Sequence, residues 1–176
     1  FYNERRKALA AVEPNEAHRL LRKLEEHFDV YVITQNVDDL HERAGSSKVL
    51  HLHGELTKVR AVDDPSLIYP LPGYDSSTTP DSTVDGHKVR PHIVFFQEAV
   101  PMFEPATEIA AEADIFVIIG TSLAVYPAAS LLHYVRPGVP VYYIDPRPSA
   151  VPDGVTVIRA TATEGMKQLY HMLVKD

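Results

Sequence analysis

The chain has 176 residues, of which 45% are apolar and 23% charged, a composition that supports one domain with its own core. Seventeen lysines and arginines against 24 aspartates and glutamates give a net charge of -7, which disfavours nucleic acid as a partner. The absence of cysteine excludes disulfides, a thiol nucleophile and cysteine-liganded zinc. Apolar runs such as 115–119 are far shorter than the roughly 20 residues that span a membrane, and no leader pattern opens the chain. We therefore expect a cytoplasmic protein.

The apolar pattern alternates between the helical and the strand period. Asn15 is a candidate N-cap, and the apolar residues from Ala17 to Phe28 are spaced as on one face of a helix. The β-branched and aromatic run from Val30 to Ile33 predicts a strand directly after that helix. The same criteria predict strands at 49–52, 93–96, 115–119, 139–144 and 155–158, and helices at 106–113, 128–135 and 163–174.

Short, uniformly apolar strands that alternate with helices are typical of a parallel sheet covered on both faces. We predict an α/β fold with a doubly wound, Rossmann-like sheet. Residues 57–90 interrupt the alternation, because prolines, aspartates and the Ser/Thr cluster 76–79 gather there. We therefore divide the chain into a Rossmann-like domain, residues 1–56 and 91–176, and a small, mostly irregular insertion, residues 57–90.

Polar residues follow three of the predicted strands, where ligands bind in such sheets. The amides of Gln35 and Asn36 suit ribose hydroxyls or a carboxamide, and Asp38 and Asp39 follow them. Residues 120–122, Gly-Thr-Ser, suit the close approach of a dinucleotide, and Asp145 suits an adenosine ribose hydroxyl. Taken singly, each group is equally compatible with an ordinary turn or helix cap, such as one before a short helix at 38–43.

Two further pairs carry candidate chemistry. His53 follows an apolar strand and precedes Gly54, and an imidazole there can take a proton from a sugar hydroxyl. His51 shares its strand face, but no third metal ligand has a useful spacing, so we predict no metal site. Tyr2 and Arg5 share a face if the first segment is helical, and they form a candidate carboxylate clamp. The alternative is a solvated basic helix that includes residues 6 and 7.

Three motifs together resemble the sirtuin family of NAD-dependent protein lysine deacylases. They are TQNVDDLHERAG with VLHLHGEL between Thr34 and Leu56, RPHIVFFQEAVP from Arg90, and GTSLAVYP from Gly120. The opening FYNERR resembles the Tyr-x-x-Arg feature of the bacterial branch that prefers succinyl and malonyl groups. The resemblance implies a transferase that moves the acyl group of a lysine to ADP-ribose and releases nicotinamide, with NAD as the cofactor.

Site roles follow from the resemblance position by position. His53 is implied as the general base. The acyl-lysine tunnel is implied at Val94 and Phe96, its peptide clasp near Glu98 and Val125, and the acyl carboxylate at Tyr2 and Arg5. NAD contacts are implied at Gln35, Asn36, Val37, Asp38, Gly120, Thr121, Ser122, Asp145 and Ala162.

The chain also departs from the family pattern. No G-x-G loop occurs, so we expect an N-terminally incomplete sirtuin fold, the alternative being a remnant that binds NAD poorly. The four zinc cysteines are absent, and Gln97 stands where the family has glycine. The predicted partners are acyl-lysine proteins or peptides, with no nucleic acid and no membrane, and we expect a monomer. A non-catalytic nucleotide or acyl-peptide binding module and a protein ADP-ribosyltransferase are the alternative functions.

Overall fold

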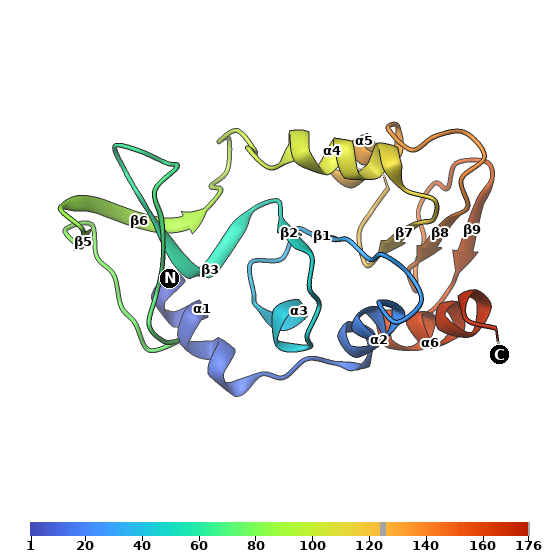
Figure 1. Ribbon diagram of the computed structural model, residues 1–176, viewed down its shortest axis with the longest axis horizontal. Coiled ribbons are helices and arrows are strands. Elements are labelled where there is room, and N and C mark those ends of the chain that lie inside the picture. Colours follow the sequence, from blue (N-terminus) through green and yellow to red (C-terminus); the bar gives the residue numbers. More distant parts are fainter. Residues whose placement is uncertain (124–125, 176) are drawn as a thin grey trace.

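The computed structural model describes residues 1–123 and 126–175 and has an α/β architecture (Figure 1). No helix in these two ranges is both long and apolar enough to cross a membrane. The chain begins with α1 (Tyr2–Ala8) and a short 3-10 helix (Leu9–Ala11). The later helices are α2 (Glu16–Leu24), α3 (Leu40–Arg43), α4 (Phe103–Glu112), α5 (Ala128–Leu132) and α6 (Ala162–Leu173).

Five strands are parallel and confirm the predicted fold class. β1 (Val32–Thr34) pairs with β2 (Val49–His51), and β8 (Val141–Ile144) lies between β7 (Phe116–Ile119) and β9 (Val155–Ile158). In Figure 1, α2 and α6 lie on one side of these strands and α4 and α5 on the other. The parallel strands therefore have the covered faces that their apolar sequences predict.

Helix α2 begins and packs as its sequence predicts. The Asn15 side chain accepts a hydrogen bond from the backbone N–H of His18, and the His18 ring accepts one from Asn15 in return. The apolar face of α2 then packs on α6 and β8, where the core residues are Ala17, Leu20, Leu24, Ile144, Met166 and Leu169. Helix α6 lies so close to β8 that a Cβ at Gly165 would come within 2.2 Å of Ile144.

The parallel strands form two separate sheets. β1 and β7 are not paired with each other, so each leaves one edge without a strand partner. A cavity of about 920 Å³ lies between them and is lined in its depth by apolar side chains, among them Val32, Val117 and Leu169. Polar residues of the loops that follow β1 and β7, Gln35 and Thr121, also border it. The slot between β1 and β7 thus runs along both strands, and we call its end at their carboxyl termini the mouth of the slot.

Residues 57–90 contain strands that our prediction did not give, although 62–67 and 71–82 have neither helix nor strand. The strands of this segment belong to a four-stranded antiparallel sheet in the order β4-β3-β6-β5. Its prolines occupy sites that a sheet tolerates, because Pro70 ends an edge strand and Pro91 lies beside a register shift. Its strands are β3 (Gly54–Ala61), β4 (Ile68–Pro70), β5 (Thr83–Val84) and β6 (His87–Ile93).

The sequence carried a hairpin signal that our prediction did not use. Asp85 and Gly86 join β5 to β6 as a two-residue turn with φ of 50° and 81°. An Asp-Gly pair is the preferred sequence for such a turn. The strand predicted at 93–96 is also wrong, because β6 ends at Ile93 and Glu98 redirects the chain after it.

We predict that Leu169→Ala lowers the free energy of unfolding by about 2–5 kcal/mol. Leu169 is fully buried where α6 packs on α2, so the substitution leaves a cavity in the largest core cluster. Met172→Ala on the same helix is the control, because Met172 is 44% exposed, and we expect it to change stability by about 0.5 kcal/mol or less. Chemical denaturation measures both, and equal losses would contradict the assigned packing.

Candidate active site

The segment after β1 is fixed to the chain between β2 and β3 through four consecutive carbonyl groups. The backbone N–H of Leu52 donates to the carbonyl of residue 34 at 2.9 Å, and that of Leu56 to the carbonyl of residue 37 at 2.8 Å. Between them, Nδ1 of His53 lies 3.2 Å from the carbonyl of residue 35, and Nδ1 of His51 lies 3.1 Å from that of residue 36. Two backbone amides and two imidazoles thus set the shape of residues 34–37.

His53 has a defined tautomer in this arrangement. A carbonyl oxygen only accepts hydrogen bonds, so Nδ1 of His53 carries the hydrogen that it donates to Gln35. Nε2 of the neutral ring then has the lone pair, and no other side-chain hydrogen bond of His53 is found among the described residues. A half-buried imidazole with a free ring nitrogen is suited to general-base chemistry.

The ends of β1 and β7 meet at the mouth of the slot between them. Nε2 of Gln35 donates to Oγ1 of Thr121 at 3.1 Å, which joins the two loops. Gly120 has a φ of 64°, and a Cβ built there would have no atom within 4 Å. Glycine therefore provides a left-handed turn beside open space, which suits close approach of a ligand. Asn36 and Ala162 line the same cavity.

The other predicted cofactor residues follow β1, β7 and β8 but are not among those that line the cavity, and the two aspartates make ordinary local bonds. Asp38 accepts from the backbone N–H of Leu40 at 3.0 Å, and Asp145 accepts from that of Arg147 at 2.7 Å, as in the turns of the simpler alternative. Oγ of Ser122 lies 3.5 Å from Oγ of Ser149. The carboxylates of Asp38 and Asp145 have further acceptor positions for a ligand. Val37 packs instead against the apolar cluster beside α1.

The chain resembles known proteins over most of its length. Residues 1–127 match the model described as the Sir2 family. An NAD-dependent protein deacylase of Bacteroides thetaiotaomicron is 52% identical over 184 residues, which cover 99% of this chain and 77% of that protein. The one of Helicobacter pylori is 46% identical, covering 99% of this chain and 76% of that protein. The chain belongs to the Sir2 family.

Solved Sir2 structures have the same fold. The structure of a Sir2 homologue in complex with NAD superimposes with a TM-score of 0.82 and 34% identity, covering 98% of this chain and 69% of that chain. The ADP-ribose complex of a Sir2 homologue mutant gives a TM-score of 0.84 at 32% identity, covering 99% and 74%. The Rossmann-like fold class is therefore confirmed.

The two arginines of α1 in this Sir2 chain, Arg5 and Arg6, have different environments. Arg6 is fully buried, with Nε donating to the carbonyl of Leu56 at 2.6 Å and a second nitrogen donating to that of Ser76 at 2.8 Å. Arg5 is exposed, and its guanidinium lies 4.9 Å from the ring centre of Phe1. The alternative prediction of a solvated basic helix is thus wrong for Arg6, because this side chain holds α1 to the antiparallel sheet. The sequence did carry a signal for this, the i, i+3 pair with Asn3, whose side chain accepts from Arg6 at 2.9 Å.

Tyr2 lies beside the segment that follows β6. Its ring stacks on Phe95 with centroids 5.4 Å apart, and both pack on the cluster that also contacts Val37. Phe96, predicted to border the tunnel, is fully exposed, whereas Val94 is half-buried and its N–H donates to the carbonyl of His53 at 2.9 Å. Phe95 is therefore the aromatic ring that faces Tyr2, a residue that the sequence motifs did not single out. Val125 lies outside the described residues.

Glu98 organises the turn after β6. Arg90 donates to both of its carboxylate oxygens, at 2.7 and 3.2 Å, and the backbone N–H of Phe95 donates to it at 2.8 Å. These hydrogen bonds, with Arg60 at 3.5 Å, lower the pKa of Glu98. Gln97 completes the turn with a φ of 68°, a left-handed conformation that favours glycine. The backbone thus keeps a glycine-like shape although the residue is glutamine.

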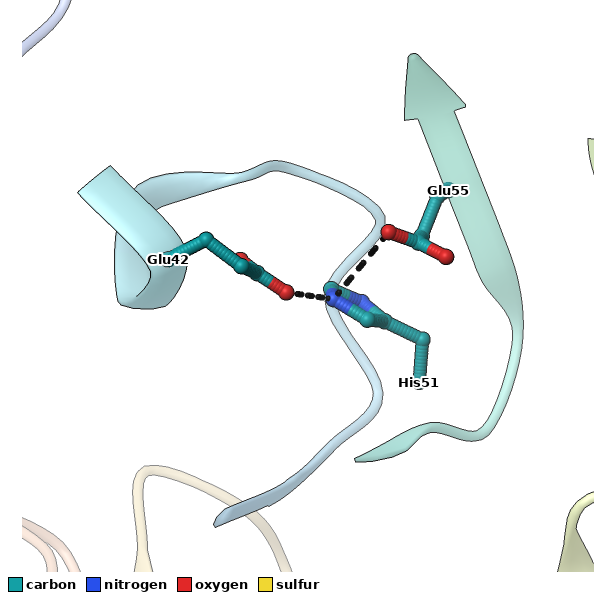
Figure 2. Close-up of side chains that lie close together, drawn as sticks. All are labelled: Glu42, His51 and Glu55. Carbon is teal, nitrogen blue, oxygen red and sulfur yellow. Dashed lines mark hydrogen bonds and ion pairs between the residues drawn. The ribbon is translucent and has the colours of Figure 1, made fainter. Parts of the chain in front are cut away.

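His51 is buried and forms a charge cluster with two carboxylates from neighbouring elements, of which Glu42 is exposed and Glu55 half-buried. Nε2 of His51 contacts a carboxylate oxygen of Glu42 on α3 and lies 3.7 Å from Glu55 on β3 (Figure 2). Three possible metal-ligand atoms of this cluster lie within 4.8 Å of one another. However, Glu42 is paired with His51, and Glu55 is paired with Lys58 at 2.8 Å, so we assign no metal to it. Sequence spacing missed Glu42 because it lies on another element.

We predict that Gln97→Gly raises the free energy of unfolding by about 0.5–1 kcal/mol. The left-handed conformation costs a residue with a Cβ about 1–2 kcal/mol, and the added chain entropy of glycine offsets part of the gain. Gln97 is exposed, so no packing is lost. Gln97→Ala keeps the Cβ and should give no such gain in the same denaturation experiment. A loss of stability in the glycine variant would contradict strain at this turn.

Proposed function

We propose that this chain removes acyl groups from protein lysine side chains with NAD, and that it favours succinyl and malonyl groups over acetyl. The observation that carries the proposal is the geometry of His53. Its Nδ1 is committed to the carbonyl of Gln35, and its Nε2, which has no side-chain hydrogen bond among the described residues, is left as a proton acceptor. Relatives named NAD-dependent protein deacylases, at up to 54% identity, support the reaction class.

The residues that follow β1, β7 and β8 fit both halves of NAD. The amides of Gln35 and Asn36 and the carboxylate of Asp38 follow β1, two hydroxyls follow β7 and Asp145 follows β8. Gln35 and Thr121 are hydrogen-bonded to each other, and glycine at residue 120 leaves room beside them. Such a set matches the hydroxyls of ribose and the carboxamide of nicotinamide. Bound NAD supplies a good leaving group, nicotinamide, and a ribose as the acyl acceptor. Gln35, Asn36 and Asp38 would hold the nicotinamide ribose, and Gly120, Thr121, Ser122, Asp145 and Ala162 the adenosine half.

The protein's part in the reaction is positioning and proton transfer. Nε2 of His53 accepts a proton from a ribose hydroxyl, and the charge that appears on the ring is stabilised through Nδ1–H by the Gln35 carbonyl. The turn at Glu98 places Val94 and Phe95 beside His53 through the bond from the Val94 N–H. We assign the acyl-lysine to this side, with Val94 and Phe96 at its border.

The acyl preference rests on Tyr2 and Arg5. Tyr2 is half-buried on Phe95, next to the residues that would border the acyl chain, and one turn later Arg5 is exposed with its charge free of any described acid. A phenol and a guanidinium on one helix face give a forked set of donors for a carboxylate. An acetyl group lacks the carboxylate that would use these donors.

We predict that His53→Ala lowers deacylation of a succinyl-lysine peptide by about 10²–10⁴-fold without loss of fold. Mass spectrometry of the peptide incubated with NAD and the full-length protein measures the reaction, and circular dichroism checks the fold. His133→Ala, at an exposed histidine, is the matched control.

Three results would contradict this function. An unchanged peptide with folded wild-type protein would remove the deacylase function. Calorimetric binding of ADP-ribose without nicotinamide release would indicate a binding module. A mass gain on a target protein would indicate ADP-ribosyl transfer.

We predict that Arg5→Met reduces desuccinylation by about ten- to hundred-fold and deacetylation much less, because a hydrogen bond to a charged group contributes about 1.5–3 kcal/mol. Lys7→Met removes a positive charge from another exposed position of α1 and is the control for general electrostatic attraction. The ratio of kcat/KM values for succinyl and acetyl peptides is the measurement. Equal losses on both peptides would contradict the clamp.

A further inference from the structure

His51 is buried at the end of β2, two residues before His53, and its two ring nitrogens contact different elements. Only 6% of its side chain is exposed. Nδ1 faces the carbonyl of Asn36 at 3.1 Å, on the segment that would hold the nicotinamide ribose. Nε2 faces Glu42 on α3, and Glu55 approaches from β3 (Figure 2). The ring therefore connects three parts of the fold.

The contacts of the ring fix its protonation state. A carbonyl and an ionised carboxylate can only accept hydrogen bonds, so both ring nitrogens must carry hydrogen to satisfy their partners. His51 is then an imidazolium. Burial by itself lowers the pKa of His51, but the hydrogen bond and charge of Glu42 outweigh it and the pKa is raised. The same pairing keeps the pKa of Glu42 low in spite of its own burial.

The charges around the ring balance. Glu42 and Glu55 provide two negative charges, and Lys58 and the imidazolium of His51 provide two positive charges. His41 and His92 also lie within electrostatic range, but burial lowers the pKa of both, so neither adds a positive charge at neutral pH. A fully paired cluster is compatible with burial, whereas an unpaired charge would not be.

On the basis of the proposed deacylase function, we propose that His51 is a positioning residue, which as an imidazolium held by Glu42 fixes the carbonyl of Asn36 and so the NAD-binding amides. The neighbouring carbonyl, that of Gln35, is the partner of His53. A peptide that rotates at Asn36 therefore disturbs both the ribose contacts and the orientation of the general base. The role of His51 is exerted through residues 35 and 36 and not through contact with substrate.

Two isosteric substitutions separate this role from a merely structural one. The amide of His51→Asn lies near the position of Nδ1 and can still donate to Asn36. The amide of His51→Gln lies near the position of Nε2 and can donate only to Glu42. We expect His51→Gln to raise the KM for NAD by roughly ten-fold or more with a smaller change in kcat, and His51→Asn to remain closer to wild type. Equal KM values in two equally folded variants would overturn the proposal.

A charge substitution tests the protonation state. Glu42→Ala removes the charge that favours the imidazolium and, unlike glutamine, puts no donor opposite Nε2. A neutral His51 cannot donate to both Asn36 and Glu42, and without Glu42 the ring loses its second proton more easily and is no longer fixed at Nε2. We therefore expect the KM for NAD to rise with pH, and to begin rising at a lower pH in Glu42→Ala than in wild type. Glu104→Ala, at an exposed acid on α4, is the control. The same KM profile in all three proteins would overturn the role of the charge.

Two measurements without turnover keep this proposal separate from the deacylase function. Calorimetry of ADP-ribose binding should rank wild type, His51→Asn and His51→Gln in the same order as the KM values, even if no deacylation is found. Nitrogen-15 shifts of the His51 ring should report two ring protons at neutral pH. Saturable Zn²⁺ binding that His51→Gln abolishes would overturn the assignment, because a metal requires an unprotonated ring nitrogen.

Discussion

The ladder of four carbonyl groups at residues 34–37 is the constraint on which the site depends. A loop at a strand end has no sheet partners of its own, yet its carbonyls need hydrogen bonds when they lie in a half-buried crevice. Here residues 51–56 supply a donor to every one of them. The same donors include His53, so the proposed general base and the amides proposed to bind a ribose are joined by one set of hydrogen bonds. Preorganisation of the site is thus a property of backbone pairing.

The proposed site lies between two parallel sheets, because the slot is bordered by β1 of one sheet and β7 of the other. Both strands are parallel, both leave one edge unpaired, and the deep wall between them is apolar. A further parallel strand there would give both edges hydrogen-bond partners and cover the apolar wall. Across this slot the side chains of Gln35 and Thr121 already touch. The two halves of the proposed NAD site are therefore held together at the mouth by side chains and in the depth by packing of α2 on α6.

The sequence predicted what depends on local chemistry. Asn15 caps α2, Gly120 adopts a positive φ after an apolar strand, and Asp145 directly follows β8, all as the residue types indicated. What it could not predict depends on partners far away in the chain. Arg6 looked like one more solvated cation until Leu56 and Ser76 were found around it. Likewise, the partners of His51 come from α3 and β3, and no spacing rule connects them.

The structure of segment 57–90 also depends on partners that are distant in the chain. Its prolines and aspartates indicated irregular structure, but strand pairing and the Asp85-Gly86 turn order part of it. Long-range hydrogen bonds then attach its loop to α1, since Asn3 bonds to Thr78 at both its side-chain oxygen and nitrogen.

Ion pairs between the antiparallel sheet and Glu98 connect the sheet to the proposed acyl-binding side of the site. Arg60 and Arg90 converge on Glu98, and Glu98 holds the backbone of Phe95. Phe95 packs on Tyr2, and the next turn of α1 carries Arg5. The charge pairs of the antiparallel sheet, through Glu98 and Phe95, therefore help to position α1, the helix on which the proposed acyl preference depends.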